Sequence, residues 1–126
     1  MRIAHLICAG VLALGLAACS SPDPVDDTHN GDLQDGASDH DGRKCDEYTI
    51  EVGSDWNVDV AMTSEWDNYV YLSSGSEDVA YNDDGDQGLN AHLVHTVTDS
   101  GTYTVYACAY SDGRGAYTLT ISASGG

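Results

Sequence analysis

The sequence predicts an all-β protein, a single small antiparallel β-sandwich of jelly-roll-like type with about seven strands. Apolar and polar residues alternate in short runs from about residue 45 onward, which is the period of strands that bury one face. Clusters of Gly, Ser, Asn and Asp separate these runs at regular intervals, as turns separate the strands of a sandwich. The 126-residue chain has 14 Gly and eight Tyr but only two Pro, a composition that favours strands and tight turns over helices.

The first residues of the chain predict export. Residues 3–18 are apolar except for His5, and this run is too short to favour a membrane-spanning helix. It ends in Leu16-Ala17-Ala18-Cys19, which resembles a bacterial lipobox. Residues 1–18 are therefore expected to be a lipoprotein signal peptide, with Cys19 as the lipidated residue that anchors the protein to the membrane. Because Ser20 rather than Asp follows Cys19, the resemblance implies the outer membrane in a Gram-negative cell. The alternative is an ordinary signal peptide with an incidental cysteine.

Residues 19–44 predict a disordered acidic tether. Positions 20–44 contain seven Asp and only three apolar side chains, which is too little apolar surface to offset the entropy lost on ordering. The Asp spacing between Asp32 and Gly42 is similar to calcium-loop repeats but does not satisfy the calcium-loop pattern. His29 and His40 lie in this segment and are expected to be solvated.

Residues 45–126 are expected to form the folded domain. Its first run alternates Tyr48, Ile50 and Val52 with Glu47, Thr49 and Glu51, which is typical of a strand with one wet face. The runs that predict strands are 48–52, 56–62, 69–72, 79–81, 89–97, 103–109 and 117–121.

A disulfide between Cys45 and Cys108 is expected. They are the two cysteines left once Cys8 is removed with the signal and Cys19 is lipidated, and export places them in an oxidising compartment. Both share the register of polar neighbours, so both should lie on faces turned away from the core. Two free thiols or a metal pair are the alternatives, and a zinc site would need further Cys or His at a recognised spacing.

Three motifs resemble the bacterial pre-peptidase C-terminal domain, a small β-sandwich of secreted proteins. The first is Asp67 followed by Val70 and Leu72, then a Gly turn and residues 82–85, which read N-D-D-G. The other two are S-G-T-Y-T-V at residues 100–105 and the alternating run from Gly115 to Ile121. The resemblance covers about residues 46–122 and implies an accessory domain rather than a catalyst.

Composition and motifs argue against several function classes. Acidic residues outnumber Lys plus Arg by 21 to 4, so the chain repels nucleic acid and anionic lipid. His92 and His95 fall on opposite faces of one expected strand and cannot act together, and His95 is expected to be a core histidine. No nucleophile elbow, zinc-protease motif or phosphate loop occurs, so the chain is not expected to be an enzyme.

Calcium is the one cofactor that the sequence suggests. Asp83, Asp84 and Asp86 cluster on one turn, Asn82 could add an amide oxygen, and Asp67 could approach from the neighbouring strand end. Carboxylate and amide oxygens are the ligands that calcium prefers. The alternative is a charged turn that faces solvent.

Four tyrosines are candidate surface residues. Tyr69, Tyr71, Tyr106 and Tyr110 occupy the register opposite the expected core residues. Exposed Tyr rows are common in protein-binding and sugar-binding faces, but Tyr is also an ordinary cross-strand partner.

The sequence thus predicts a non-catalytic, lipid-anchored module of the cell envelope that binds a protein or a polysaccharide. One alternative is an accessory domain that aids secretion or maturation of a partner protein, which the name of the resembling family implies. The other is a small hydrolase, which would need a nucleophile and a base that the motifs do not supply.

Overall fold

The computed structural model describes residues 22–83 and 90–125, and this part of the chain forms strands but no helix. The strands are β1 (Val25–Leu33), β2 (Ser38–His40), β3 (Arg43–Val52), β4 (Asn57–Ser64), β5 (Asn68–Ser74), β6 (Glu77–Asn82), β7 (His92–Thr96), β8 (Gly101–Ala109) and β9 (Gly115–Ser124). No helix capable of crossing a membrane is therefore found in the described ranges.

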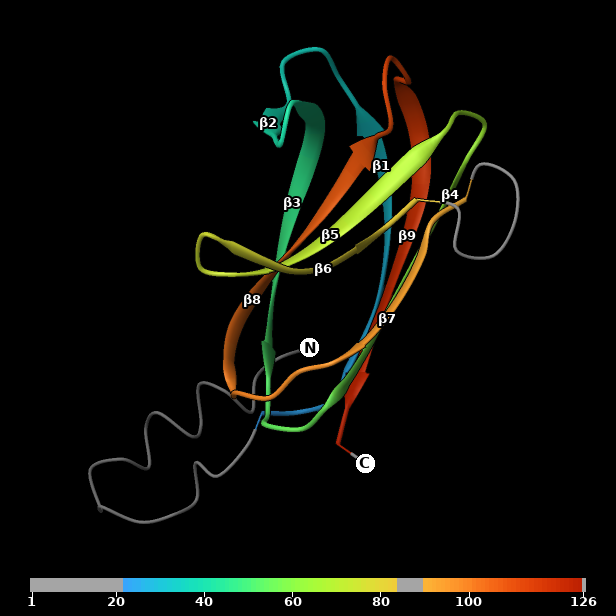
Figure 1. Ribbon diagram of the computed structural model, residues 1–126. Coiled ribbons are helices and arrows are strands. Elements are labelled where there is room, and N and C mark those ends of the chain that lie inside the picture. The colour runs from blue at the N-terminus through green and yellow to red at the C-terminus, as the bar shows by residue number, and fades with distance from the viewer. Residues whose placement is uncertain (1–21, 84–89, 126) are drawn as a thin grey trace, which may run out of the picture.

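The strands form two sheets that face each other (Figure 1). The four-stranded sheet has the order β1-β9-β4-β7, and the five-stranded sheet has the order β2-β3-β8-β5-β6. Every neighbouring pair is antiparallel. The predicted all-β sandwich is confirmed, with nine strands where about seven were expected.

The core lies between the two sheets and consists of the apolar residues of the alternating runs. Residues 58, 60 and 62 of β4 face inward, whereas Asn57, Asp59 and Thr63 face solvent. Burying one such aliphatic side chain contributes about 1.5–3 kcal/mol. The side chains without measurable exposure include Leu33, Val58, Val60, Met62, Val70, Leu72, Val105, Leu119 and Ile121.

The expected disordered tether is wrong for residues 25–44, because this segment belongs to the sandwich. β1 pairs with β9 along nine residues, from Val25 opposite Ala123 to Leu33 opposite Gly115. Only the two ends of β1 are fully buried, so the strand lacks an apolar period. As an edge strand it gains its order from backbone hydrogen bonds to β9, which depend little on side-chain type.

The two histidines of this segment are also ordered rather than solvated. The ring of His29 on β1 stacks on Tyr48 of β3 with the ring centroids 4.4 Å apart. The ring of His40 on β2 stacks on Tyr106 of β8 at 3.8 Å. Each histidine therefore joins strands that are distant in the sequence.

Candidate functional site

The outer face of the five-stranded sheet is covered by aromatic side chains. Because side chains alternate along a strand, Tyr69 and Tyr71 of β5 point outward while Val70 and Leu72 enter the core. Register places Tyr71 opposite Tyr106 on one side and opposite Tyr81 on the other. We call this surface the aromatic face, and it consists of His40, Tyr69, Tyr71, Tyr81, Tyr106 and Tyr110.

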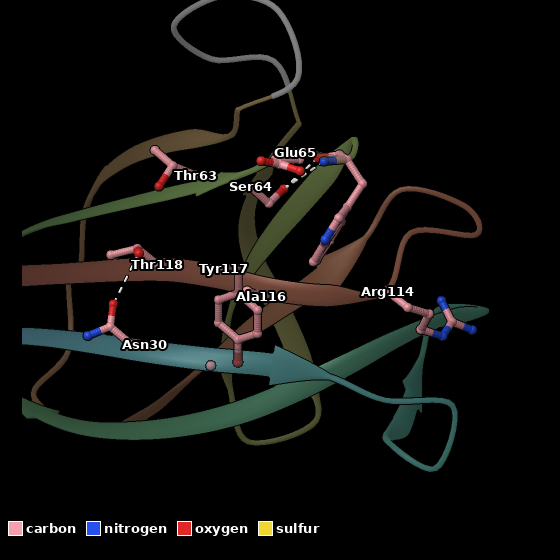
Figure 2. Close-up of a pocket in the computed structure, with 10 residues that line it drawn as sticks. Asn30, Thr63, Ser64, Glu65, Arg114, Ala116, Tyr117 and Thr118 are labelled. Carbon is pink, nitrogen blue, oxygen red and sulfur yellow. Dashed lines mark hydrogen bonds between the residues drawn. The ribbon is translucent and has the colours of Figure 1, made fainter.

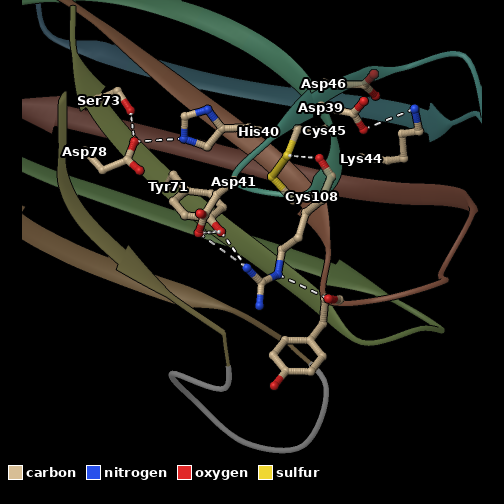
Figure 3. Close-up of a disulfide and its surroundings, with 12 residues drawn as sticks. Asp39, His40, Asp41, Lys44, Cys45, Asp46, Tyr71, Ser73, Asp78 and Cys108 are labelled. Carbon is tan, nitrogen blue, oxygen red and sulfur yellow. Dashed lines mark hydrogen bonds and ion pairs between the residues drawn. A yellow bond between two sulfur atoms is a disulfide. The ribbon is translucent and has the colours of Figure 1, made fainter. Parts of the chain in front are cut away.

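A disulfide lies beneath the aromatic face (Figure 3). Cys45 and Cys108 occupy directly opposite positions of β3 and β8, and they are bonded, with 4.0 Å between their Cα atoms. Both are fully buried with Tyr71 in a small cluster on the side of the sheet away from the core. The predicted disulfide is confirmed, and so is its location off the core face.

Arg43 lies over the tyrosine rings. Its guanidinium carbon is 4.3 Å from the ring centroid of Tyr69 and 5.0 Å from that of Tyr110. Nη1 donates to the hydroxyl of Tyr71 at 2.8 Å, and Nε donates to the backbone carbonyl of Tyr110 at 3.1 Å. Because three rings and one carbonyl hold the guanidinium, its charge is fixed at the surface and attracts the ring faces.

His40 spans the aromatic face from one edge of the sheet to the other. It belongs to edge strand β2, and its Nε2 lies 2.8 Å from Oδ1 of Asp78 on the opposite edge strand β6. Ser73 donates to the same carboxylate oxygen (Figure 3). Asp78 is thus the central group, and Ser73 is 1% exposed, so this trio does not present a hydroxyl activated by histidine.

Two tyrosines supply most of the accessible aromatic surface. Tyr81 is 62% exposed and Tyr110 is 43% exposed, whereas Tyr71 is only 2% exposed. Tyr69 lies between them in strand order, with its ring centroid 6.1 Å from that of Tyr81 and 6.0 Å from that of Tyr110. The three rings are inclined by less than 30° to one another in these pairs, so they form a row of similarly oriented rings.

Burial raises the pKa of three phenols of the aromatic face. It raises the pKa of Tyr71 to about 12, and the hydrogen bond to Asp41 adds to this effect, while Arg43 opposes it. Burial also raises the pKa of Tyr69 and of Tyr106. The hydroxyl groups of Tyr69, Tyr71 and Tyr106 are therefore neutral at neutral pH, and the positive charge of Arg43 is paired with Asp41, whose Oδ2 lies 3.6 Å from Nη1.

The structure brings the four predicted tyrosines together but gives them different roles. Tyr71 is enclosed and structural, while Tyr110 is open to a partner. Sequence reasoning missed Tyr81, because in the run at residues 79–81 it shares the parity of the apolar Val79, which packs against the core. It also missed His40 and Arg43, because both fell in the segment interpreted as a tether.

The predicted calcium ligands lie only partly within the described residues. Asp84 and Asp86 fall outside them, while Asp67, Asn82 and Asp83 fall inside. Pairing of Val70 with Asn82 shows that Asp67 lies near the end of the sheet at which β6 ends. In residues 22–83 and 90–125, no three His, Cys, Asp or Glu side chains are grouped so that they could hold a metal ion. Calcium therefore stays a prediction.

The histidines of β7 lie on opposite faces of the strand, as expected. His92 is paired in register with Ala61, and its Nε2 lies 2.8 Å from Oδ1 of Asp59 on the outer face. His95 has the inward register but is half-buried rather than enclosed in the core. The two rings do not share a site.

A groove of about 600 Å³ lies where β1, β9 and β4 meet the turns at one end of the sandwich (Figure 2). Asn30, Thr118 and Thr63 lie side by side on these three strands, and the hydroxyl of Thr118 donates to Asn30 Oδ1 at 3.1 Å. Trp66 and Arg114 contribute from the β4–β5 and β8–β9 connections. No sequence motif predicted this groove.

Tyr117 closes the inner side of the groove and joins the two sheets. Its hydroxyl lies 2.5 Å from that of Tyr48 and donates to Asp46 Oδ2 at 2.5 Å, both on β3. Burial is the main cause that raises the pKa of Tyr117, and its bonds to Asp46 and Tyr48 add to the effect. The phenol therefore stays neutral.

Comparisons with known proteins identify the fold. No protein-family model matches the chain, and no curated protein matches it. It is similar to the pre-peptidase C-terminal domain of collagenase from Bacillus anthracis, with a TM-score of 0.60 and 24% identity over 77% of this chain and 89% of that one. It is also similar to a periplasmic inhibitor of g-type lysozyme from Aeromonas hydrophila, with a TM-score of 0.56 and 13% identity over 86% of this chain and 91% of that one. The expected likeness to the pre-peptidase C-terminal fold is confirmed.

Proposed function

We propose that this chain, which has the fold of a pre-peptidase C-terminal domain, is a non-catalytic module of the cell envelope that binds another protein through its aromatic face. The observation that supports this is the exposure of Tyr81 and Tyr110 beside a guanidinium held over the rings. Tyr and Arg are enriched among the residues that dominate protein–protein binding energy. A lysozyme inhibitor shares the fold, which is consistent with protein binding.

The aromatic face is preorganised for binding. Cys45 and Cys108 join its central strands, His40 links its two edges, and Arg43 bonds to Tyr71 below the exposed rings. Side chains that are already ordered lose little conformational entropy when a partner arrives. The face can therefore convert its apolar contact area into affinity.

The charge of the chain indicates the kind of partner. The formal net charge is −17, and Asp41, Asp78 and Asp83 border the aromatic face. A partner with basic residues around an apolar centre would be steered toward this surface, while an acidic partner would be repelled.

Export and anchoring are part of the proposal. They are supported by the lipobox-like Leu16-Ala17-Ala18-Cys19, which lies outside the described residues, and by a disulfide that suits an oxidising compartment. Cys19→Ala should abolish acyl labelling and release the protein from membranes. An unlabelled wild-type protein would contradict the anchor without affecting the binding face.

A capture experiment tests the binding face. The full-length protein and its Tyr81→Ala/Tyr110→Ala variant are used as baits for envelope proteins at low and at moderate salt. Val94→Ala is the matched control, because Val94 is 63% exposed but lies on the other sheet. A partner lost with the tyrosine variant, retained with the control and weakened by salt supports the proposal. Equal capture by all three baits refutes it, and retention on insoluble polysaccharide through the same tyrosines would replace the protein with a glycan.

A further inference from the structure

The groove beside Trp66 is separate from the aromatic face and has a different chemistry. Its volume of about 600 Å³ is within the range of small-molecule sites, roughly 300–1,000 Å³. The backbone bond from Tyr110 N to Asp67 O, at 2.8 Å, lies in the turns between the two surfaces. The lining of the groove comes from the four-stranded sheet and these turns, so a ligand in the groove would contact that sheet and not the aromatic face.

Hydroxyl and amide groups line the sheet side of the groove. Asn30, Thr118 and Thr63 are neighbours across β1, β9 and β4, and they point to the outer face (Figure 2). Hydroxyl groups both donate and accept hydrogen bonds, and an amide offers two donors and an acceptor. Such a row matches a ligand edge that carries several hydroxyl groups.

Trp66 gives the groove one aromatic wall. A Cβ at Gly113 would lie 2.6 Å from its ring, so the indole packs directly on that backbone. Ser64 Oγ donates to the carbonyl of Trp66 at 2.5 Å, and the edge of Tyr117 meets the indole at an interplanar angle of 81°. The ring is therefore held in place, and a flat apolar ligand surface can pack on it without ordering it first.

The groove is lined by one acidic and one basic side chain, although the chain carries −17. Among the described lining residues, Glu65 and Arg114 carry the opposite charges. Arg114 is already engaged, because its Nε donates to Asp35 at 2.8 Å and its Nη1 donates to the carbonyl of Gly113 at 2.6 Å. An anion would have to displace Asp35 against the field of the whole chain, and the lining offers a cation only the carboxylate of Glu65, so an uncharged ligand suits the remaining hydroxyl and amide groups.

We propose that this groove binds an uncharged oligosaccharide. A sugar ring has an apolar C–H face that packs on Trp66 and an equatorial rim of hydroxyl groups that bond to Asn30, Thr63 and Thr118. The ligand chemistry follows from the combination of one fixed indole, a row of uncharged polar side chains and balanced charge in an acidic protein. This site is independent of the proposed protein-binding face.

Intrinsic fluorescence provides a local readout. The chain has two tryptophans, and Trp56 is only 8% exposed and packs on Gly53 and Gly125, away from the groove. The probes are tetramers of N-acetylglucosamine, glucose in β-1,4 linkage and glucose in α-1,4 linkage, with tetragalacturonate and tetraglucosamine as charged comparisons. At least one uncharged tetramer should change the fluorescence saturably, and Trp66→Phe should remove the change.

Two variants on one strand separate the groove from the rest of the sheet. Thr118→Val should weaken binding about fivefold, the effect of one lost hydrogen bond, and Asn30→Ala combined with it should weaken binding more than tenfold. Thr120→Val is the matched control, because Thr120 lies on the same outer face, two residues further along β9. The Thr120→Val variant should bind the tetramer as tightly as the wild type does. Calorimetry measures these affinities without relying on the fluorescence of Trp66.

Several results would overturn the proposal. They are the absence of saturable binding by any uncharged tetramer, tighter binding of a charged one, or equal losses in Thr118→Val and Thr120→Val. Loss of sugar binding in Tyr81→Ala/Tyr110→Ala, with the groove variants unaffected, would transfer the activity to the aromatic face. The first three results do not bear on protein capture by the aromatic face, so the groove proposal can fail while the proposed function stands.

Discussion

The ring of Tyr117 lies directly against Gly31, its cross-strand partner, and passes over this glycine to reach the other sheet. Gly31 and Tyr117 are paired in register on β1 and β9, and a Cβ at Gly31 would overlap the phenol ring. The hydroxyl of Tyr117 then bonds to Asp46 on β3. The missing side chain of one residue thus makes room for a bridge between the two layers.

Gly31→Ala should therefore destabilise the protein by about 1–3 kcal/mol, the cost of overpacking a filled interior. Gly36→Ala is the control, because a Cβ there would have no neighbour within 4 Å. Urea denaturation measures both free energies of unfolding. In a Tyr117→Leu background the penalty of Gly31→Ala should shrink, because the aromatic ring is gone. A cost equal to that of Gly36→Ala would contradict the packing argument.

Removing the disulfide should cost about 2–4 kcal/mol. Cys45 and Cys108 are separated by 63 residues in the sequence, and closing a loop of this length restricts the unfolded chain strongly. Cys45→Ala/Cys108→Ala should lower the melting temperature by about 4–8 °C for each kcal/mol lost. Mass spectrometry of native protein should find no free thiol at these positions. Equal stability of oxidised and reduced protein would show that the disulfide does not stabilise the fold.

Tyr71 should contribute to a loss of stability at alkaline pH. The phenol has a pKa of about 12 in the folded protein against 10.0 for an unperturbed tyrosine, so the folded state binds this proton more tightly than the unfolded state. Its contribution, at most about 2–3 kcal/mol, is complete below about pH 10 and is lost as the pH rises toward about 12. Urea midpoints and tyrosinate absorbance measure this loss. Tyr71→Phe should show a shallower decline, and parallel curves for both proteins would exclude Tyr71 as the source.

Calcium should raise the melting temperature if the acidic turn after β6 binds it. Native-state binding stabilises by mass action, and magnesium should help less because it requires stricter geometry. Asp83→Asn should remove most of the gain, and Asp67→Asn should do the same if Asp67 contributes a ligand. Asp26→Asn, an exposed change on β1, is the control for charge alone. Equal melting temperatures in calcium and in EDTA at matched ionic strength would support the alternative, a charged turn that faces solvent and binds no calcium.

The alternating runs after residue 45 were sufficient to predict seven strands, because their apolar residues face a shared core. The same reasoning failed for β1, whose inward positions include His29 and Gly31 rather than aliphatic residues. His29 stacks on Tyr48, and Gly31 leaves room for the ring of Tyr117. Neither contact produces an alternation of apolar residues in the sequence. The groove was unpredictable for a related reason, since it depends on Gly31 and Gly113 and on turns that meet only in the fold. The outward direction of Tyr69 and Tyr110 was predictable, because the alternation of side chains along a strand is enough to identify its outer face.

The start of β1 at Val25 limits how far the domain can stand from a bilayer. A lipid attached at Cys19 would be joined to this strand by six residues, which span at most about 22 Å when fully extended. Val25 pairs with Ala123, so this connection reaches the domain at the end of the sandwich where β9 ends. Gly31, beside the groove, is six residues further along β1, which places it about 20 Å from Val25. In a lipidated protein, the end of the sandwich that carries Val25 would thus be tied to the membrane, and the groove would lie toward the opposite end.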